Sequence, residues 1–211
     1  MASVQKFAQH EVAAQLNHIE RSIAQPSNID IDRHRTADNY SLLPLRDMSC
    51  YDYYRQRKAE LYCYNRKDVK VMAGWIVTAP KNLPVSEQGK FFKESYNFLA
   101  ERYGEENIIE AIVHNDEGGQ PHLHCCFIPV KYDKKHDRYK ICANDVLTRR
   151  ELRNFHPALK KYLFEHGVSA DVNSRITREQ GGNRTVSDLK KERARDWNRE
   201  TEREEITRGR W

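Results

Sequence analysis

The chain has 211 residues, which is enough for one domain with its own hydrophobic core and short for two. Hydrophobic residues make up 38% and charged residues 32%, which indicates a modest core beneath a highly charged surface, while seven Phe, eleven Tyr and three Trp argue against a disordered chain. Because no apolar stretch approaches the ~20 residues of a membrane span and the N-terminus lacks a signal-peptide pattern, we expect neither a membrane protein nor a secreted one.

The distribution of charge is more informative than the net charge of +5. Residues 131–166 hold ten Lys or Arg against five Asp or Glu, which accounts for the whole excess. A basic surface favours an anionic partner such as nucleic acid, and a solvated basic helix is the alternative explanation. The five cysteines are odd in number and form no Cys-x-x-Cys motif, which indicates a reduced, cytosolic protein.

The first part of the chain predicts one strand and two helices. Residues 2–7 favour a short strand, and residues 9–24 favour a helix that Pro26 ends. Residues 27–38 are polar and predict a loop, and residues 47–67, rich in Tyr, Arg and Lys, predict a second helix. The first helix carries one apolar stripe at steps of four, three and four, formed by Val12, Leu16, Ile19 and Ile23.

A second strand and a long helix follow. Residues 69–78 are rich in residues that favour strands and end before Pro80. Residues 86–103 predict a helix that Ser86 caps and Gly104 stops. Its buried face is marked by helical spacing of Phe91, Phe92, Ser95, Phe98, Leu99 and Arg102.

Two further strands are expected to form a hairpin. Residues 107–114 and 121–130 have strand character, and the intervening turn, residues 115–120, is short and rich in Asn, Asp and Gly. A second charged turn is expected at residues 133–137.

The next helix is expected to begin at a capping box formed by Thr148 and Glu151. We expect it to end at Gly167, with a kink at Pro157, and a last strand to follow over residues 168–172.

The C-terminal part is almost uniformly charged from Thr185 onward. Its positive and negative charges nearly cancel, so it can bury little and predicts a solvated helix. We therefore expect one domain over residues 1–195, followed by a charged helical extension over residues 196–211 that leads toward a further region.

Three histidines form the most specific motif of the chain: His114, His122 and His124. Side chains alternate along a strand, so His122 and His124 share one face, with Cβ atoms roughly 6–7 Å apart. His114 ends the preceding strand, and a hairpin would bring it beside the other two. Three neutral imidazoles on a rigid sheet make an open metal site, and such a donor set suits Mn²⁺, Ni²⁺, Co²⁺ or Zn²⁺ better than Mg²⁺.

The same alternation assigns the neighbouring residues to faces of the sheet. Leu123, Cys125 and Phe127 lie on the opposite face, where we expect them to pack against helices. Cys126 falls on the histidine face further along the strand and is an alternative ligand. The alternative to a metal site is a set of ordinary surface histidines, which the third histidine makes the weaker interpretation.

His18 and Arg21 are three residues apart on the first predicted helix and share a face beside its apolar stripe. A histidine nitrogen can attack phosphorus to give a phosphoramidate, and a nearby Arg can bind phosphate or stabilise charge in the transition state. The alternative is a plain surface pair. A competing phenolate nucleophile is offered by Tyr40, Tyr51, Tyr53 and Tyr54, although aromatic packing also explains the last three.

In this order the motifs resemble the Mob/Pre family of plasmid mobilisation relaxases, the MobV type. The resemblance spans roughly residues 3–195 and is most specific at the histidine hairpin, which resembles His-x-Asp-Glu-x-x-Pro-His-x-His. The weaker segments are His18-Ile-Glu-Arg21, Asn39-Tyr40-Ser-Leu, Arg66-Lys67-Asp68 with Trp75-Ile-Val-Thr78, and Thr185-Val-Ser-Asp-Leu-Lys190.

The chain departs from the family pattern at one position. Glu117 and His122 are five apart in number, whereas the family pattern has four. The extra residue lies in the turn formed by Gly118, Gly119 and Gln120, where glycines can absorb it without moving the strands.

The resemblance implies an HUH-type α+β fold, an antiparallel sheet with helices on one face and the metal site on the other. It implies that His18 is the nucleophile, that Arg21 and Arg66 contact the DNA backbone near the cleaved bond, and that Glu117 orients or deprotonates a catalytic imidazole. Further contacts to DNA are expected from Lys67, Tyr40, Lys131, Lys134 and Lys135.

The function that follows is a metal-dependent, site-specific endonuclease and strand transferase. We expect it to nick and rejoin one strand of supercoiled DNA at a transfer origin through a covalent histidine–5′-phosphate link, with Mn²⁺ as the preferred ion. Other relaxosome or conjugation proteins, dimerisation through a missing C-terminal part, and the bacterial cytoplasm belong to the same expectation. The alternatives are a rolling-circle replication initiator with a Tyr nucleophile and a non-catalytic DNA-binding autoregulator.

Overall fold

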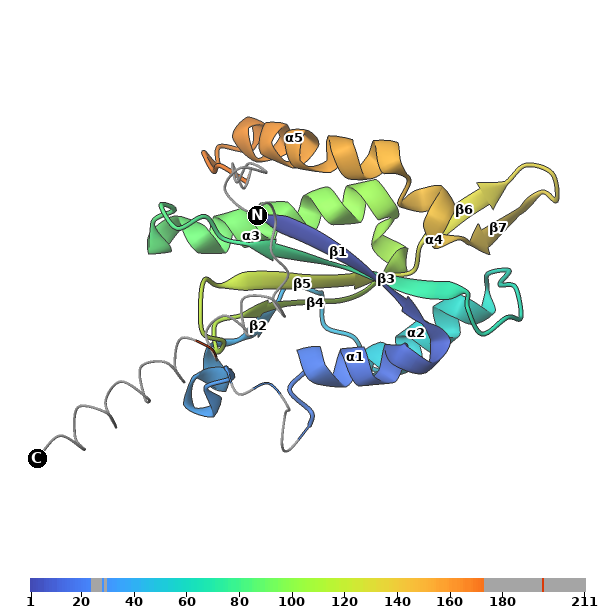
Figure 1. Ribbon diagram of the computed structural model, residues 1–211, viewed down its shortest axis with the longest axis horizontal. Helices are drawn as coiled ribbons and strands as arrows, with labels where there is room; N and C mark the ends of the chain where they lie inside the picture. The colour runs from blue at the N-terminus through green and yellow to red at the C-terminus, as the bar shows by residue number, and fades with distance from the viewer. Residues whose placement is uncertain (24–27, 29, 173–194, 196–211) are drawn as a thin grey trace, which may run out of the picture. The chain divides into compact units, whose positions relative to one another are not determined.

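The computed structural model describes residues 1–23, 28, 30–172 and 195, and residues 1–172 make up one unit with its own core. Among the described residues, five strands form an antiparallel sheet in the order β1-β3-β5-β4-β2 (Figure 1). The strands are β1 (Ala2–Ala8), β2 (Tyr40–Ser41), β3 (Lys70–Thr78), β4 (Ile108–His114) and β5 (His122–Phe127). The predicted helix after Thr185 and the predicted domain border at residue 195 fall outside the described part of the chain.

One face of the sheet is covered by α3 (Val85–Tyr103) and α5 (Arg149–Glu165), which lie above the sheet in Figure 1. Trp75 of β3 stacks on Phe155 of α5 with ring centroids 3.4 Å apart, and Tyr103 stacks on Phe127 of β5 at 4.1 Å. The same hydrophobic core contains Leu123 and Cys125, so the predicted inward face of β5 is confirmed.

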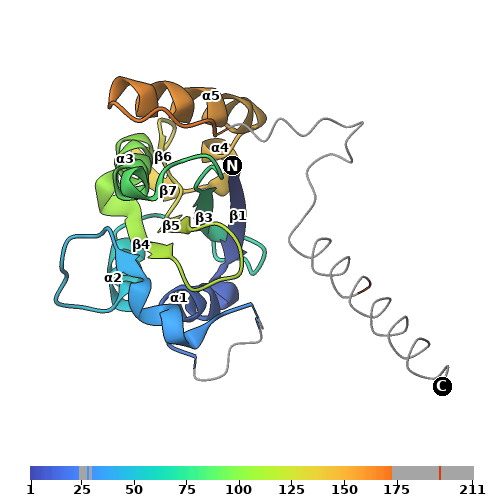
Figure 2. The same cartoon turned by 90° about the vertical axis from the view of Figure 1, so that its left-hand side faces the viewer.

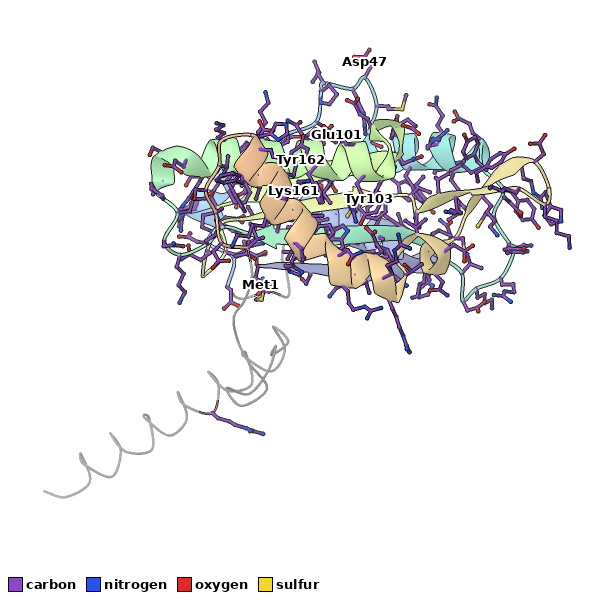
Figure 3. All side chains as sticks on the ribbon, turned by 90° about the horizontal axis from the view of Figure 1, so that it is seen from above. Met1, Asp47, Glu101, Tyr103, Lys161 and Tyr162 are labelled. Carbon is purple, nitrogen blue, oxygen red and sulfur yellow. The ribbon has the colours of Figure 1, made fainter. Side chains whose placement is uncertain are left out.

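The two covering helices also contact each other at their polar edge. In Figure 3 the labelled Tyr162 of α5 lies beside Glu101 of α3, and its hydroxyl donates a 2.8 Å hydrogen bond to that carboxylate. The predicted start of α5 is confirmed, because the Thr148 hydroxyl accepts a hydrogen bond from the Glu151 amide. Residues 168–172, predicted as a strand, pair with no strand in the described part of the chain, yet Val168 and Val172 are buried against the same core.

The histidine face of the sheet is partly covered by α1 (Val12–Ile19) and α2 (Cys50–Ala59), which lie on the other side of the sheet from α3 and α5 (Figure 2). Val12, Leu16 and Ile19 are at most 1% exposed and pack with Tyr54 of α2. Helices therefore lie on both faces of the sheet, whereas the sequence resemblance implied helices on one face. The reason is the apolar stripe of α1, which needs a partner surface and finds it beside the histidines.

The ends of three predicted helices differ from the structure. α1 begins after a 3₁₀ turn, η1 (Gln9–Glu11), and ends at Ile19, so Ile23 lies beyond it and is 42% exposed. α2 spans Cys50–Ala59 within the longer predicted range, and Ser49 caps it by accepting a hydrogen bond from an amide of its first turn. α3 begins at Val85 after Pro84, so Ser86 lies inside the helix and is not its cap.

The remaining described elements are short. The polar segment after α1 contains the 3₁₀ helix η2 (Arg33–Asp38), and η3 (Glu105–Asn107) precedes β4. A separate two-stranded sheet, β6 (Val130–Asp133) and β7 (Arg138–Ile141), surrounds the predicted charged turn and leads into α4 (Ala143–Val146). The helices of the described residues include none with the length and apolar character that a membrane span requires.

Candidate active site

The antiparallel register of β4 and β5 brings three histidines together. His114 at the end of β4 lies directly opposite His122 at the start of β5, and His124 is two residues further along the same face. The ring centroids of the three imidazoles are 4.6–5.5 Å apart. The structure therefore gathers the three predicted ligands at one end of the sheet.

Glu117 completes this cluster from the turn between the two strands. One ligand atom from each of His114, Glu117, His122 and His124 can be chosen so that all four lie within 4.8 Å of one another. The turn is held in place because Glu117 forms an isolated bridge with Ile31. The extra residue of the turn therefore leaves Glu117 beside the imidazoles, and we call these four residues the histidine centre.

Hydrogen bonds fix the tautomer of two imidazoles. The carbonyls of Ile19 and Gln120 can only accept, so His114 donates from Nε2 at 2.8 Å and His122 donates from Nδ1 at 3.2 Å. His122 Nε2 then keeps its lone pair for a metal, as in many metal sites where a second hydrogen bond orients the imidazole. The lone pair of His114 Nδ1 accepts a 3.0 Å hydrogen bond from Arg21 Nη2, which a bound metal would replace. Within the described residues the buried Nε2 of His124 has no hydrogen-bond partner. An unpartnered buried donor atom amid nitrogen and carboxylate ligands fits a divalent metal.

Burial sets the protonation state of the histidine centre. His114 is 1% exposed and His124 is 6% exposed, because the end of α1 covers them: His114 bonds to the Ile19 carbonyl and the His18 ring contacts that of His124. Burial, reinforced by the charge of Arg21, lowers the pKa of His114 to about 4, and burial together with the neighbouring imidazoles lowers that of His124 well below its ordinary value. Both side chains are therefore neutral at neutral pH, which is the form that binds a metal.

Arg21 links the end of α1 to the hairpin turn. Its guanidinium makes a bidentate pair with Asp116, with Nε at 2.9 Å and Nη2 at 2.8 Å, and Nη2 lies 2.7 Å from Glu117 Oε1. Nη1 donates to the carbonyl of His18, and Nη2 lies 3.0 Å from His114 Nδ1. Arg21 adopts a left-handed backbone conformation with φ of 58° beyond the end of α1. Most of its donors are engaged within the protein, so Arg21 holds the end of α1 against the hairpin turn, and its predicted contact with DNA stays a prediction.

Asp116 is a site residue that the sequence analysis did not single out. Its side chain is fully buried, and it accepts hydrogen bonds from Arg21 and from the Thr36 hydroxyl of η2. Although burial alone would raise the pKa of Asp116, the hydrogen bonds from Arg21 and its neighbours hold that pKa well below its ordinary value. The signal in the sequence was its place in the Asn115-Asp116-Glu117 turn, directly after His114.

We expect Arg21→Ala to destabilise the metal-free protein by about 3–5 kcal/mol, because it leaves the buried Asp116 carboxylate without its partner. The free energy of unfolding should be measured by denaturant titration in EDTA. The control is Arg66→Ala, which removes a 69% exposed side chain paired with Asp68 at 3.3 Å and should change stability by less than about 0.5 kcal/mol. Equal effects of the two substitutions would contradict the structural role of Arg21.

His18 lies in the last turn of α1, next to the histidine centre. Its ring contacts that of His124 edge-on, with centroids 6.3 Å apart. Burial lowers the pKa of His18, and the charge of Arg21 lowers it further, so the imidazole is neutral at neutral pH and keeps a free lone pair. A potential nucleophile is thus held beside a potential metal site.

Three of the four tyrosines that were alternative nucleophiles are engaged in packing or hydrogen bonds on or near α2. Tyr54 is fully buried in the core, and its hydroxyl donates to Gln9. Tyr53 donates to the carbonyl of Glu106, and Tyr51 packs against Tyr54. Tyr40 of β2 is 38% exposed and lines a pocket of about 190 Å³ together with Arg21 and Thr36, among other residues. Of these side chains, Tyr40 is the one placed beside the site residues.

The predicted basic contacts lie away from the histidine centre. Arg66 and Lys67 precede the start of β3, whereas Thr78 at the other end of β3 faces His122, so roughly 25 Å of strand separates them. The structure therefore does not bring Arg66 to the histidines, and a catalytic contact at that centre is not supported. Lys131, Lys134 and Lys135 are exposed on the β6–β7 hairpin, which projects from the end of the sheet opposite the β4–β5 turn (Figure 1).

Comparisons with known proteins give consistent results. A family model described as plasmid recombination enzyme, Mob_Pre, matches residues 1–202. The plasmid recombination enzyme of Lactiplantibacillus plantarum is 32% identical over 199 residues, which cover 90% of this chain and 52% of that protein. The plasmid recombination enzyme of Bacillus thuringiensis is 30% identical over 173 residues, covering 80% of this chain and 38% of that protein. The chain thus spans about half the length, or less, of these curated relatives.

Solved structures agree with the sequence relatives. The manganese-bound relaxase domain of MobM (MOBV; Mob_Pre) in complex with plasmid pMV158 oriT DNA at pH 6.8 is 28% identical, with a TM-score of 0.73, and the match covers 90% of this chain and 97% of that one. A second manganese-bound MobM complex, at pH 4.6, is 27% identical with a TM-score of 0.71, covering 90% and 98%. The match of the family model to residues 1–202 confirms the family that the histidine hairpin predicted, and the chain belongs to the plasmid recombination enzymes, Mob_Pre.

Proposed function

We propose that this chain is the relaxase domain of a plasmid mobilisation protein, which cleaves and rejoins one DNA strand at a transfer origin. The observation that carries the proposal is the neutral imidazole of His18, held against the histidine centre at the end of the sheet. The similarity to the MobM relaxase domain bound to oriT DNA supports the same substrate class.

The residues proposed to hold a divalent metal are His114, Glu117, His122 and His124. Manganese is the proposed ion, since imidazole and carboxylate donors suit it and the MobM structures are manganese-bound. When bound, such an ion supplies Lewis-acid polarisation of the scissile phosphate and offsets its charge. This assignment changes the role of Glu117 from the orientation of an imidazole to metal ligation.

His18 is the proposed nucleophile. Its neutral imidazole forms a bond to phosphorus in line with the leaving 3′-oxygen, the proton that the imidazole gives up ends on that oxygen as the 3′-hydroxyl, and the 5′-phosphate stays on the protein as a phosphoramidate. The new P–N bond conserves the energy of the broken bond, so rejoining is the reverse step and needs no ATP. Arg21 holds the carbonyl of His18 and the turn of Glu117 at once, and thereby fixes the nucleophile relative to the ligands.

The proposal is tested by nicking of supercoiled plasmid that carries the DNA flanking the gene for this protein. We expect nicked circles and a protein–DNA adduct with Mn²⁺, and neither in excess EDTA. Full nicking in EDTA would overturn the metal assignment. Tight binding without any adduct would indicate a DNA-binding autoregulator, and an adduct on Tyr would indicate an initiator of rolling-circle replication.

The affinity for origin DNA is expected to fall steeply with salt. Each Lys or Arg contact to phosphate releases counterions and contributes about −0.7 to −0.9 to the slope of log K against log salt concentration. The exposed Lys131, Lys134 and Lys135 on the β6–β7 hairpin are proposed contacts, so replacing all three by Ala should make the slope shallower by about 2–3. Fluorescence anisotropy with a labelled origin oligonucleotide at several salt concentrations measures this slope.

The matched control replaces Lys81, an exposed lysine in the turn between β3 and α3, and should leave the slope unchanged. An unchanged slope in the triple variant would place the DNA path elsewhere on the molecule.

A further inference from the structure

Glu110 is an acidic residue in the middle of the sheet. It lies in β4, is 1% exposed and is paired in register with Cys126 of β5. Among the described residues neither of its carboxylate oxygens has a hydrogen-bond partner of ordinary geometry, and the polar group that faces this carboxyl is the Cys50 thiol. Buried polar groups are almost always hydrogen-bonded, because a buried polar group without a partner loses its hydrogen bonds to water and gains none in the folded protein. A carboxyl group in this position therefore indicates a ligand.

Two further side chains that can bind a metal, those of Cys50 and Glu20, lie beside the carboxyl group of Glu110. Cys50 is the first residue of α2, and Glu20 caps the C-terminal end of α1. The Cys50 sulfur and one carboxylate oxygen from each glutamate lie within 4.8 Å of one another. Glu20 is exposed and Cys50 is half-buried, so the group is buried at Glu110 and open to solvent at Glu20. A small ion can reach it without any movement of the sheet.

We propose that Glu20, Cys50 and Glu110 form a second divalent-metal site, for an ion of the Zn²⁺ class. A thiolate with two carboxylates suits Zn²⁺ better than Mg²⁺ or Ca²⁺, because sulfur is a soft ligand, and a water molecule would complete four-coordinate geometry. The site shares no donor with the histidine centre. Glu110 and His114 are four residues apart on β4, which separates the two positions by about 13 Å.

The charge around the proposed site is suited to a dication. Three anionic donors and one Zn²⁺ leave a net charge of about −1, which costs free energy in a half-buried position. Arg46 supplies an opposite charge nearby, and donates to the carbonyls of Ile108 and Ile109 at the start of β4. Burial raises the pKa of the Cys50 thiol to about 12, the charges of Glu110 and Glu20 raise it as well, and the Arg46 guanidinium opposes that rise to a smaller extent. The positive charge of Arg46 therefore lies close to Glu20, Cys50 and Glu110 and partly offsets their negative charge.

The three donors come from three elements that converge on the end of α1. Glu20 directly follows Ile19, whose carbonyl accepts the hydrogen bond from His114, and it is two residues from His18. An ion at this site would tie the last turn of α1 to α2 and β4. Its role is therefore structural: it fixes the helix end that carries His18.

Cobalt is the probe that separates the two sites. A cysteine thiolate bound to Co²⁺ gives a near-ultraviolet charge-transfer band, and the histidine centre contains no cysteine, so the band reports the second site alone. Titration of the full wild-type chain with Co²⁺ should reveal two bound equivalents and the thiolate band. Cys50→Ser should lose the band and retain one equivalent, and Glu110→Gln should weaken binding at this site on the order of 100-fold.

Two matched variants complete the experiment. Cys63→Ser removes another half-buried thiol outside the cluster and should keep the band. His122→Ala removes a donor of the histidine centre and should lose one equivalent while it keeps the band. Glu110→Gln replaces an unpaired buried carboxyl with a neutral group of equal size, so it is expected to fold, and circular dichroism checks this.

A folded wild-type chain without a thiolate band, or a band that survives Cys50→Ser, would overturn the second site. Nicking of origin DNA is measured on the same protein. If the protein nicks DNA but shows no thiolate band, the proposed relaxase function stands and the second metal site is refuted. If the protein shows the band but does not nick DNA, the second metal site stands and the proposed function is refuted.

Discussion

His18→Ala is expected to abolish strand cleavage and to leave the affinity for origin DNA nearly unchanged. The imidazole is the neutral group that contacts the histidine centre from α1, and alanine offers no atom that can attack phosphorus. Loss of a nucleophile lowers the rate by at least about 10³-fold, because the remaining groups still bind and polarise the phosphate but form no covalent link. Affinity persists because it is the sum of many phosphate contacts.

Mass spectrometry of the trapped adduct identifies the linked residue, and the adduct on His18 should be lost in acid, as a P–N bond is. The matched control is His10→Ala, which removes an exposed histidine from η1 at the other end of the same helix and should nick at the wild-type rate. An adduct that still forms in His18→Ala, or that maps to Tyr40, would assign the nucleophile to a tyrosine and the chain to the initiator-like class.

Local patterns were enough to predict the parts of the fold that depend on neighbours in the sequence. The alternation of His122, Leu123 and His124 determined which face each side chain occupies, because a strand has a fixed period of two. The turn between the strands was recognisable from its Asn, Asp and Gly residues, so the pairing of His114 with His122 followed from the hairpin.

The sequence-based predictions differ from the structure where contacts between residues distant in the sequence override local secondary-structure preference. The spacing of Ile23 continued the stripe of α1, yet the helix stops at Ile19, because Arg21 turns back to pair with Asp116, a residue 95 positions away. Nothing in a His-x-x-Arg motif indicates that Arg21 pairs with Asp116 and Glu117, so these contacts could not be predicted from the sequence. Burial of the histidines was missed for a related reason, since the position of α1 over the sheet depends on tertiary packing.

His124→Ala is expected to lower metal-dependent nicking by about 10³-fold, because a divalent ion contributes several kcal/mol of charge stabilisation to the transition state. The substitution should destabilise the metal-free fold only through the cavity that the buried ring leaves, since the Nε2 of His124 has no hydrogen-bond partner among the described residues. His114→Ala should lower the stability in EDTA by more. It leaves a cavity and also removes the hydrogen bond to the Ile19 carbonyl and a contact of Arg21.

Thermal unfolding with and without Mn²⁺ separates a loss of metal binding from a loss of stability of the metal-free protein. A ligand that binds only the folded state at 100 times its Kd stabilises it by about 2.7 kcal/mol, so Mn²⁺ should raise the Tm of the wild type and leave that of His124→Ala unchanged. His136→Ala, a 45% exposed histidine on the turn between β6 and β7, is the control and should keep the full shift. If His124→Ala retained the Mn²⁺-dependent shift and wild-type nicking, this imidazole would not be a ligand. The unpartnered nitrogen would then reflect the packing of α1 over the sheet, and the metal would be held by His114, Glu117 and His122 alone.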